Sequence, residues 1–176
     1  MYEFRQNDFA VRCIMCGVSG LDPTTYADAA AFAADNAAIT TVSEDQETIS
    51  AIASCEGAMN AIAEDRSALT TIAASQTATD EVYENTVSIN ALNNSSLVET
   101  TVYEGGECAG AGHNYRNDRV VLLSHNSAQF AADLANTSEF GRSAGDQPQT
   151  ANQVAQNTNV NDGRNAANAQ ITFIDV

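Results

Sequence analysis

Four cysteines and two histidines are the residues of this sequence best suited to metal chemistry. Cys13-x-x-Cys16, Cys108 and His113 could together supply the four thiolate and imidazole ligands that a zinc ion takes. A structural zinc site, however, usually combines one Cys-x-x-Cys pair with a second pair at a similar spacing. Cys108 and His113 lie five residues apart and far from the first pair. Buried, reduced thiols therefore explain the cysteines better, and we expect no bound metal.

Other patterns typical of enzymes and cofactor sites are incomplete. Ser124 and His125 are adjacent, and adjacent residues of a strand point to opposite faces, so this serine lacks a base. The glycine-rich run 105–112 lacks the spacing and the following helix of a dinucleotide-binding loop. The segment 157–163 is similar to a calcium-binding loop, but its glycine comes one position late. We therefore expect neither catalysis nor a cofactor.

The charge of the chain restricts its partners. The sequence has 176 residues and a net charge of −16, from 23 Asp and Glu against 7 Arg and no Lys. A field of this sign repels nucleic acid and anionic membranes, so we expect neither as a partner. No run reaches the ~18 apolar residues of a membrane-spanning helix, and the N-terminus lacks the apolar core of a secretory signal.

A ten-residue repeat occupies the middle of the chain. The units are 38–47, 48–57, 58–67, 68–77, 78–87 and 88–97. In each unit the first residue is small, the second and fifth are mostly apolar, and the last four or five are mostly polar. Apolar pairs spaced three apart fit one face of a helix rather than of a strand. The start is marked by Asp22-Pro23, because Asp favours the N-cap and Pro the first helical position.

The period of ten constrains the helix. Ten residues in three turns give about 3.3 residues per turn, against 3.6 in a relaxed helix, so a straight helix loses roughly 80° of register per unit. Either helices wind around one another in a left-handed supercoil, or the helix loosens at each polar segment. We expect a continuous or mildly broken helix over 22–94. The alternative is an ordinary amphipathic helix packed on the C-terminal region.

Such a helix needs copies of itself, because its narrow apolar stripe has no partner helix in the chain. Isoleucine at both apolar positions favours three or more strands over two. We therefore predict a homotrimer whose seam consists of the second and fifth residues of the units. These residues are Ile39, Val42, Ile49, Ile52, Met59, Ile62, Leu69, Ile72, Val82, Ile89 and Leu92.

Two of the units carry a resemblance to a known class of proteins. AMNAIAEDRS (58–67) and ALTTIAASQT (68–77) resemble the tandem decapeptides of tailed-bacteriophage fibres and fibre-like virion proteins. The resemblance implies a trimeric fibre in the virion, made in the host cytoplasm. It also implies that a capsid or tail protein holds one end and that the distal end contacts a host surface receptor.

The two ends of the chain differ from the repeat. The segment 1–21 contains an isolated apolar stretch, and we predict that Phe9, Val11, Ile14 and Met15 anchor it in a virion protein. The alternative is that this segment folds back on its own stalk. The region 95–176 has β-type runs at 97–104, 119–125 and 171–176, with a polar, Asn-rich stretch between them.

The expected fold class is thus α+β and fibrous. It consists of an attachment segment (1–21), a helical coiled-coil-like stalk (22–94) and a small β-rich knob (95–176), assembled as a homotrimer with its N-terminus inward. Two other functions remain open: a capsid decoration protein without a receptor role, and a globular binding module.

Overall fold

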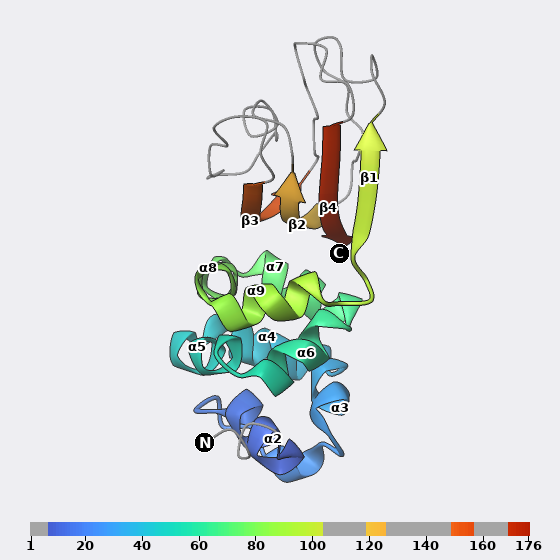
Figure 1. Ribbon diagram of the computed structural model, residues 1–176. Helices are drawn as coiled ribbons and strands as arrows, with labels where there is room; N and C mark the ends of the chain where they lie inside the picture. The colour runs from blue at the N-terminus through green and yellow to red at the C-terminus, as the bar shows by residue number, and fades with distance from the viewer. Residues whose placement is uncertain (1–6, 104–118, 126–148, 157–168) are drawn as a thin grey trace. The chain divides into compact units, whose positions relative to one another are not determined.

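The computed structural model describes residues 7–103, 119–125, 149–156 and 169–176 of the chain, with side chains described for 7–100 and 172–176. The chain divides into two compact units, Met1–Leu97 and Val98–Val176. Each unit is described by itself below (Figure 1).

The described part of the first unit consists of short helices. Their bounds are α2 (Asp8–Cys16), η1 (Pro23–Thr25, a 3-10 turn), α3 (Ala29–Ala33), α4 (Asn36–Glu44), α5 (Gln46–Ala53), α6 (Glu56–Ala63), α7 (Arg66–Ala74), α8 (Gln76–Glu84) and α9 (Thr86–Asn93). From α4 onward each helix has eight or nine residues. Helices of this length are unstable alone in water even when rich in alanine, so packing must hold them together.

A residue in extended backbone conformation precedes each of these helices, and it is polar before all of them except α6, where it is Cys55. It is the N-cap of the following helix: Asp35, Asp45, Asp65, Ser75 and Asn85 each accept a backbone N–H two or three residues ahead. An N-cap residue leaves helical geometry, so it resets the register that a straight helix would lose. The ten-residue period is therefore one short helix and its cap.

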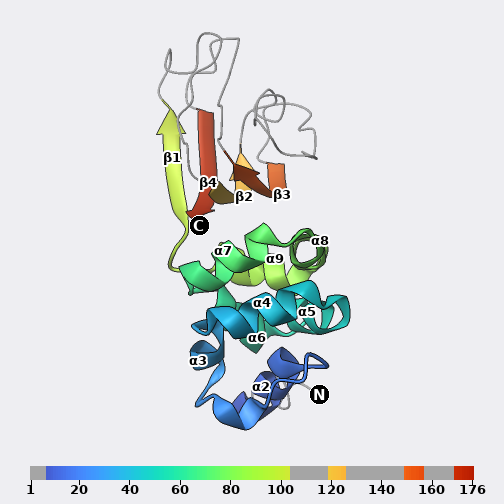
Figure 2. The same ribbon diagram turned by 180° about the vertical axis from the view of Figure 1, so that it is seen from behind.

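The helices stack in three layers. Helices three apart in sequence pack against each other: α4 with α7, α5 with α8, and α6 with α9. The first layer is α2, η1 and α3, with α2 against α5 and α3 against α6. Figures 1 and 2 show the second layer (α4, α5, α6) lying between the first layer and the third (α7, α8, α9). Three ten-residue units thus complete one layer.

The predicted fold class is wrong. The chain does not form a coiled-coil stalk from 22 to 94, because the helix breaks at every N-cap and the pieces pack on one another within a single chain. The apolar stripe has partners after all: they lie about thirty residues away in the same chain. Ten of the eleven predicted seam residues are buried there, namely Ile39, Val42, Ile49, Ile52, Met59, Ile62, Leu69, Ile72, Val82 and Leu92, and Ile89 is half-buried.

Serine hydroxyls tie the third layer to the second. Each donates to a backbone carbonyl at the end of a helix in the layer before, and such carbonyls lack a partner within their own helix. The pairs are Ser75 with Ser43 at 2.7 Å, Ser88 with Ala53 at 2.7 Å, and Ser95 with Ala63 at 2.6 Å. These bonds fix which helix lies above which.

The described strands of the second unit form one antiparallel sheet. The strands β1 (Glu99–Tyr103), β2 (Arg119–His125), β3 (Gln149–Gln156) and β4 (Ala169–Asp175) lie in the order β1-β4-β2-β3. Phe173 and Ile174 are neighbours in β4, and both are fully buried. Since neighbouring residues of a strand point to opposite faces, both faces of β4 are covered at this point.

The layered arrangement predicts that insertions of thirty residues are tolerated better than insertions of ten. Duplicating residues 35–64 after Glu64 adds one layer and keeps all three serine bonds. Duplicating only 55–64 shifts every later helix by one position in its layer, so that it lies over a different helix of the layer before. The three serine bonds are then lost, at about 1 kcal/mol each. We expect cooperative melting in both, with the ten-residue insertion about 3 kcal/mol less stable than the thirty-residue one. Chemical denaturation followed by circular dichroism measures the difference. Equal stabilities would contradict the assignment of the layers.

Cys55 offers a test of the caps. It occupies the N-cap position of α6, is 3% exposed, and makes no side-chain cap bond. Cys55→Ser supplies an oxygen of the right reach in nearly the same volume, so we expect unfolding free energy to rise by about 1 kcal/mol. The reverse change, Ser75→Cys, should lower it by at least as much, because Ser75 also donates to Ser43. Destabilisation by Cys55→Ser would show that the cap oxygen is not what sets the period.

Candidate functional site in the N-terminal layer

The first layer is the least regular part of the first unit, and its helix α2 contains the four predicted anchor residues and the Cys13-x-x-Cys16 pair. Helix α2 begins after Asn7, whose side chain accepts the backbone N–H of Ala10 at 3.2 Å. Its inner face consists of Ala10, Val11, Met15 and Cys16, all buried. This face packs against α5 and α6, so α2 covers the end of the helical core.

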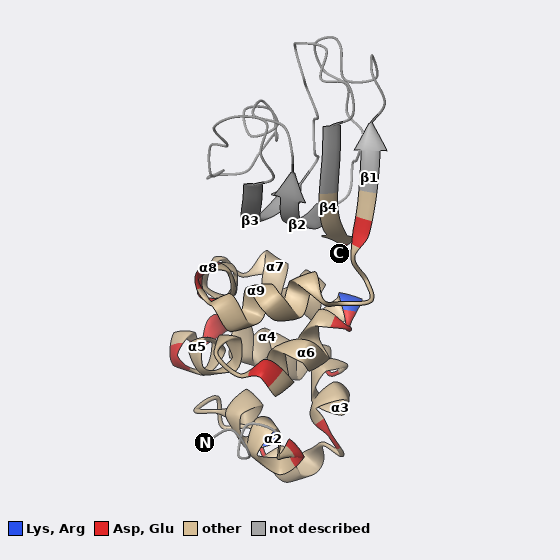
Figure 3. Ribbon diagram, viewed as in Figure 1, with Lys and Arg blue, Asp and Glu red and all other residues tan. Residues whose placement is uncertain are grey.

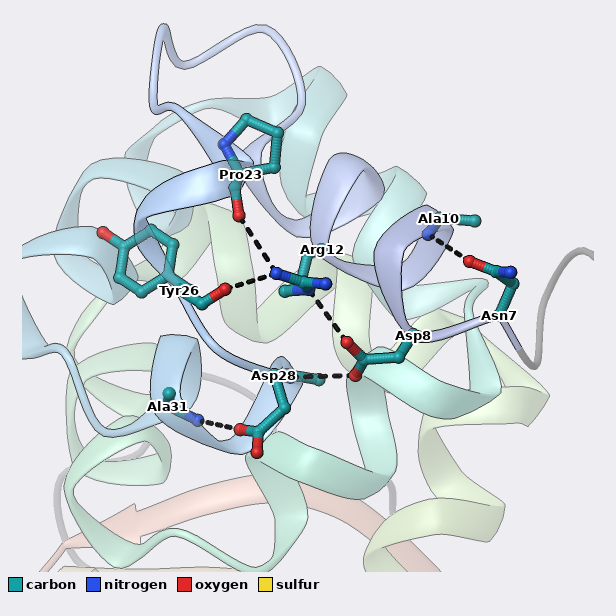
Figure 4. A network of polar contacts seen from close by, with 9 residues as sticks. Asn7, Asp8, Ala10, Arg12, Pro23, Tyr26, Asp28 and Ala31 are labelled. Carbon is teal, nitrogen blue, oxygen red and sulfur yellow. Dashed lines mark hydrogen bonds and ion pairs between the residues drawn. The ribbon is translucent and has the colours of Figure 1, made fainter.

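Arg12 connects α2 to the segment that follows it (Figure 4). Its Nε lies 2.9 Å from Asp8 Oδ2, an ion pair rather than an aligned hydrogen bond. Its Nη1 donates to the carbonyl of Tyr26 and, at 3.5 Å, to that of Pro23. Asp8 Oδ1 also accepts the N–H of Ala29, the first residue of α3, at 3.3 Å. The two charged side chains of α2 thus link it to η1 through the Pro23 carbonyl, and to α3 through the N–H of Ala29.

Tyr26 extends this network to the second layer. Its hydroxyl donates to Asp35 Oδ2 at 3.1 Å, and its ring meets Phe32 edge-on at a centroid distance of 4.9 Å. The N–H of Ala38 and the Tyr26 hydroxyl hold the pKa of Asp35 below its usual value, whereas burial and the Asp35 hydrogen bond raise the pKa of Tyr26. The network was not predicted from the sequence. Its one visible signal is Arg12, a lone base inside an apolar stretch.

The four predicted anchor residues differ from one another in exposure. Val11 and Met15 are buried in the chain's own core, and Ile14 is half-buried. Phe9 is 50% exposed, and the Arg12 guanidinium lies 5.5 Å from the centroid of its ring. Val18, two residues after α2, is 60% exposed. Phe9 and Val18 are the large apolar side chains that the described residues leave exposed, and both belong to this layer.

The cysteines of this layer are free thiols. Cys13 is half-buried and Cys16 is buried, both on α2. Burial, and next the nearby Cys13, raise the pKa of Cys16, so its thiolate form is less populated than that of an ordinary cysteine. Cys108, His113 and the runs 105–112 and 157–163 lie outside the described residues. Ser124 and His125 lie in β2, but their side chains are not among those described. Within the part of the chain that is described, no three or more His, Cys, Asp or Glu side chains are grouped to hold a metal ion.

A shallow groove lies between α5 and α8. It encloses about 530 Å³ and is lined by Gln46, Glu47, Ser50, Ala51, Ser54 and Glu81. Gln46 Nε2 donates to Glu81 Oε1 at 3.1 Å across it. Five of its six lining residues are polar, and none is a histidine or a cysteine. Figure 3 shows acidic residues spread over the helices of the first unit, with few basic ones among them.

Comparison of the chain with protein-family models, curated proteins and solved structures finds no match. Among the helices of the described residues, none has the length and apolar character needed to cross a membrane.

The lowered pKa of Asp35 predicts acid sensitivity of the first layer. A carboxyl group whose pKa is lower in the folded than in the unfolded state stabilises the fold above the unfolded pKa, here near 3.8. That contribution is lost as pH falls through the folded pKa. The free energy of unfolding should therefore decrease as the pH falls from about 4 through the lower pKa of folded Asp35.

The matched control is Asp35→Asn, since Asn also caps helices well but does not titrate. Its stability should fall less steeply with acidification than that of the unchanged chain, as measured by urea denaturation at several pH values. Identical pH profiles would show that Asp35 has the same pKa in both states.

Proposed function

We propose that this chain is a non-catalytic structural protein of a virion fibre or fibre-like virion appendage. In this proposal the stacked helices of the first unit act as a spacer between an attachment end and the second unit. The observation that supports it most is the way in which the ten-residue repeat folds. Each decapeptide is one capped helix, and thirty residues make one layer, so length can change without new interfaces.

The resemblance of 58–67 and 68–77 to phage-fibre decapeptides supports the same function. In the structure these two units span the end of the second layer and the beginning of the third. Their shared Ala and Ile positions, Ala58 with Ala68 and Ile62 with Ile72, are all buried. The residues that carry the resemblance are thus the ones that stack layer on layer.

The N-terminal layer is the proposed attachment end, and the partner is a capsid or tail protein. Phe9 and Val18 are exposed there while Val11 and Met15 hold α2 in place. Two large apolar side chains exposed in one layer of a chain with net charge −16 favour an interface that buries them. In a homotrimer the chains would contact one another through the outer surfaces of the helices, because ten of the eleven predicted seam residues are buried within each chain. The second unit, residues 98–176, is the proposed distal part that contacts a host surface.

Replacing Phe9 tests the attachment end. Particles are assembled in the presence of the tagged chain carrying Phe9→Ser, and the amount incorporated is quantified by mass spectrometry. The control variant is Thr70→Ser, which changes an exposed residue of α7. Loss of one buried Phe weakens binding by about 1.5–3 kcal/mol, which is roughly ten- to a hundredfold. We expect that loss for Phe9→Ser only, with both variants keeping the helical circular-dichroism spectrum.

Labelling the tag in negatively stained particles then locates the protein. A label at the end of fibres supports the proposal. A label spread over the capsid surface would indicate the decoration protein instead. Absence of the unchanged chain from particles would overturn a virion role and favour the globular binding module.

A further inference from the structure

The Cys13-x-x-Cys16 pair has a role beyond the proposed function and independent of it. We propose that Cys13 and Cys16 form a reversible intrachain disulfide by exchange with a small-molecule disulfide such as oxidised glutathione. The bond would make the position of the last turn of α2 depend on the redox state of the surroundings.

The helix brings the two residues within reach of each other. Both belong to α2 (Asp8–Cys16) and are three positions apart, hence on the same side of the helix. In α-helical geometry their Cα atoms are about 5 Å apart, which is inside the range found for disulfides. Their Cβ atoms, at about 5–6 Å, are 1–2 Å too far apart. The bond therefore requires the last turn to tighten.

The end of α2 is the place in the helix where such tightening meets least resistance. Cys16 is its last residue, and Gly17 follows with a φ of 42°, which ends the helix. Gly17 N–H makes the last i→i−4 bond of the helix, to the Cys13 carbonyl at 2.9 Å. The next bond, from Ser19 N–H to the Cys16 carbonyl at 3.2 Å, is of the tighter i→i−3 type. The strain that remains makes the bond easier to reduce. The pair should therefore be open in a reducing compartment and closed in an oxidising one.

The difference in burial sets the order of the two exchange steps. Cys13 is half-buried, whereas Cys16 is 2% exposed, so a dissolved disulfide reaches Cys13 first. The Cys13 thiolate attacks one sulfur of oxidised glutathione, and the other half leaves as glutathione thiolate. Cys16, after losing its proton, attacks Cys13 Sγ and displaces the second glutathione. The protein loses two electrons and two protons, and the small disulfide becomes two thiols.

The neighbouring layer would sense the change. A side-chain carbon built on Gly17 would lie 2.6 Å from Thr48 Cγ2, so the backbone at Gly17 already touches α5. The N–H of Val18 donates to Thr48 Oγ1 at 3.2 Å. Drawing Cys16 toward Cys13 moves this junction, which joins the first layer to the second.

The experiment uses the full chain carrying Cys55→Ser and Cys108→Ser, so that two thiols remain. The protein is equilibrated in glutathione buffers from reducing to oxidising, quenched with acid, and its thiols are counted by maleimide labelling and intact mass. We expect both thiols to disappear together, with a loss of two hydrogens and no glutathione adduct. Adding Cys16→Ser should leave a glutathione adduct on Cys13, and adding Cys13→Ser should leave Cys16 reduced.

Two results would overturn the proposal: a stable glutathione adduct in the two-thiol chain, or both thiols free across the whole range. Should that chain fail to fold by circular dichroism, peptide mapping of the oxidised unsubstituted chain makes the same decision. Amide exchange at Val18 provides a second readout. It should become severalfold faster on oxidation, and an unchanged rate would contradict the movement at Thr48.

Discussion

The hydrogen bond from a helix N-terminus to the side chain of the residue before it determines the architecture of the first unit. It recurs at Asp35, Asp45, Asp65, Ser75 and Asn85, with Cys55 as the one position of the series that lacks it. Each cap ends one helix and aims the next, so three helices return the chain to its starting side. The apolar positions then meet their equivalents thirty residues on, and the layers follow from that spacing.

Part of this arrangement could be predicted from the sequence. The repeat identified the positions that become buried, since Ile49, Ile52 and Ile62 all lie in the core. It did not identify what buries them. A stripe at second and fifth positions satisfies a supercoil of several chains and a stack of short helices in one chain equally well. The cap residues carried the deciding signal, because Asp, Ser and Asn recur at ten-residue spacing, with Cys55 as the one exception, and these residues begin helices better than they continue them.

The N-terminal site was less predictable because it depends on contacts between segments of different character. Apolar residues before Asp22 were expected to face a partner, yet Val11 and Met15 face the chain's own core. The opposite side of α2 is tied to the following segment by Arg12, which donates to the Tyr26 carbonyl, and by Asp8, which accepts the N–H of Ala29. No repeat or local sequence motif predicts these contacts, because they join residues 14 and 21 positions apart in the chain. The strands β1, β2 and β4 overlap the expected β-type runs, whereas β3 lies in the polar stretch between them.

The stacking of equivalent helices also determines how the first unit would respond to a pulling force. Each layer contacts only the layers next to it, so its stability is approximately a sum of neighbour terms. Tension applied to the chain ends would therefore release one layer at a time from an end of the stack. A released layer of thirty residues extends to about 100 Å, compared with the ~10 Å that it occupies between packed helices. A spacer built in this way would lengthen in steps of about 90 Å before its core is lost, and would absorb work that a single rigid helix would transmit.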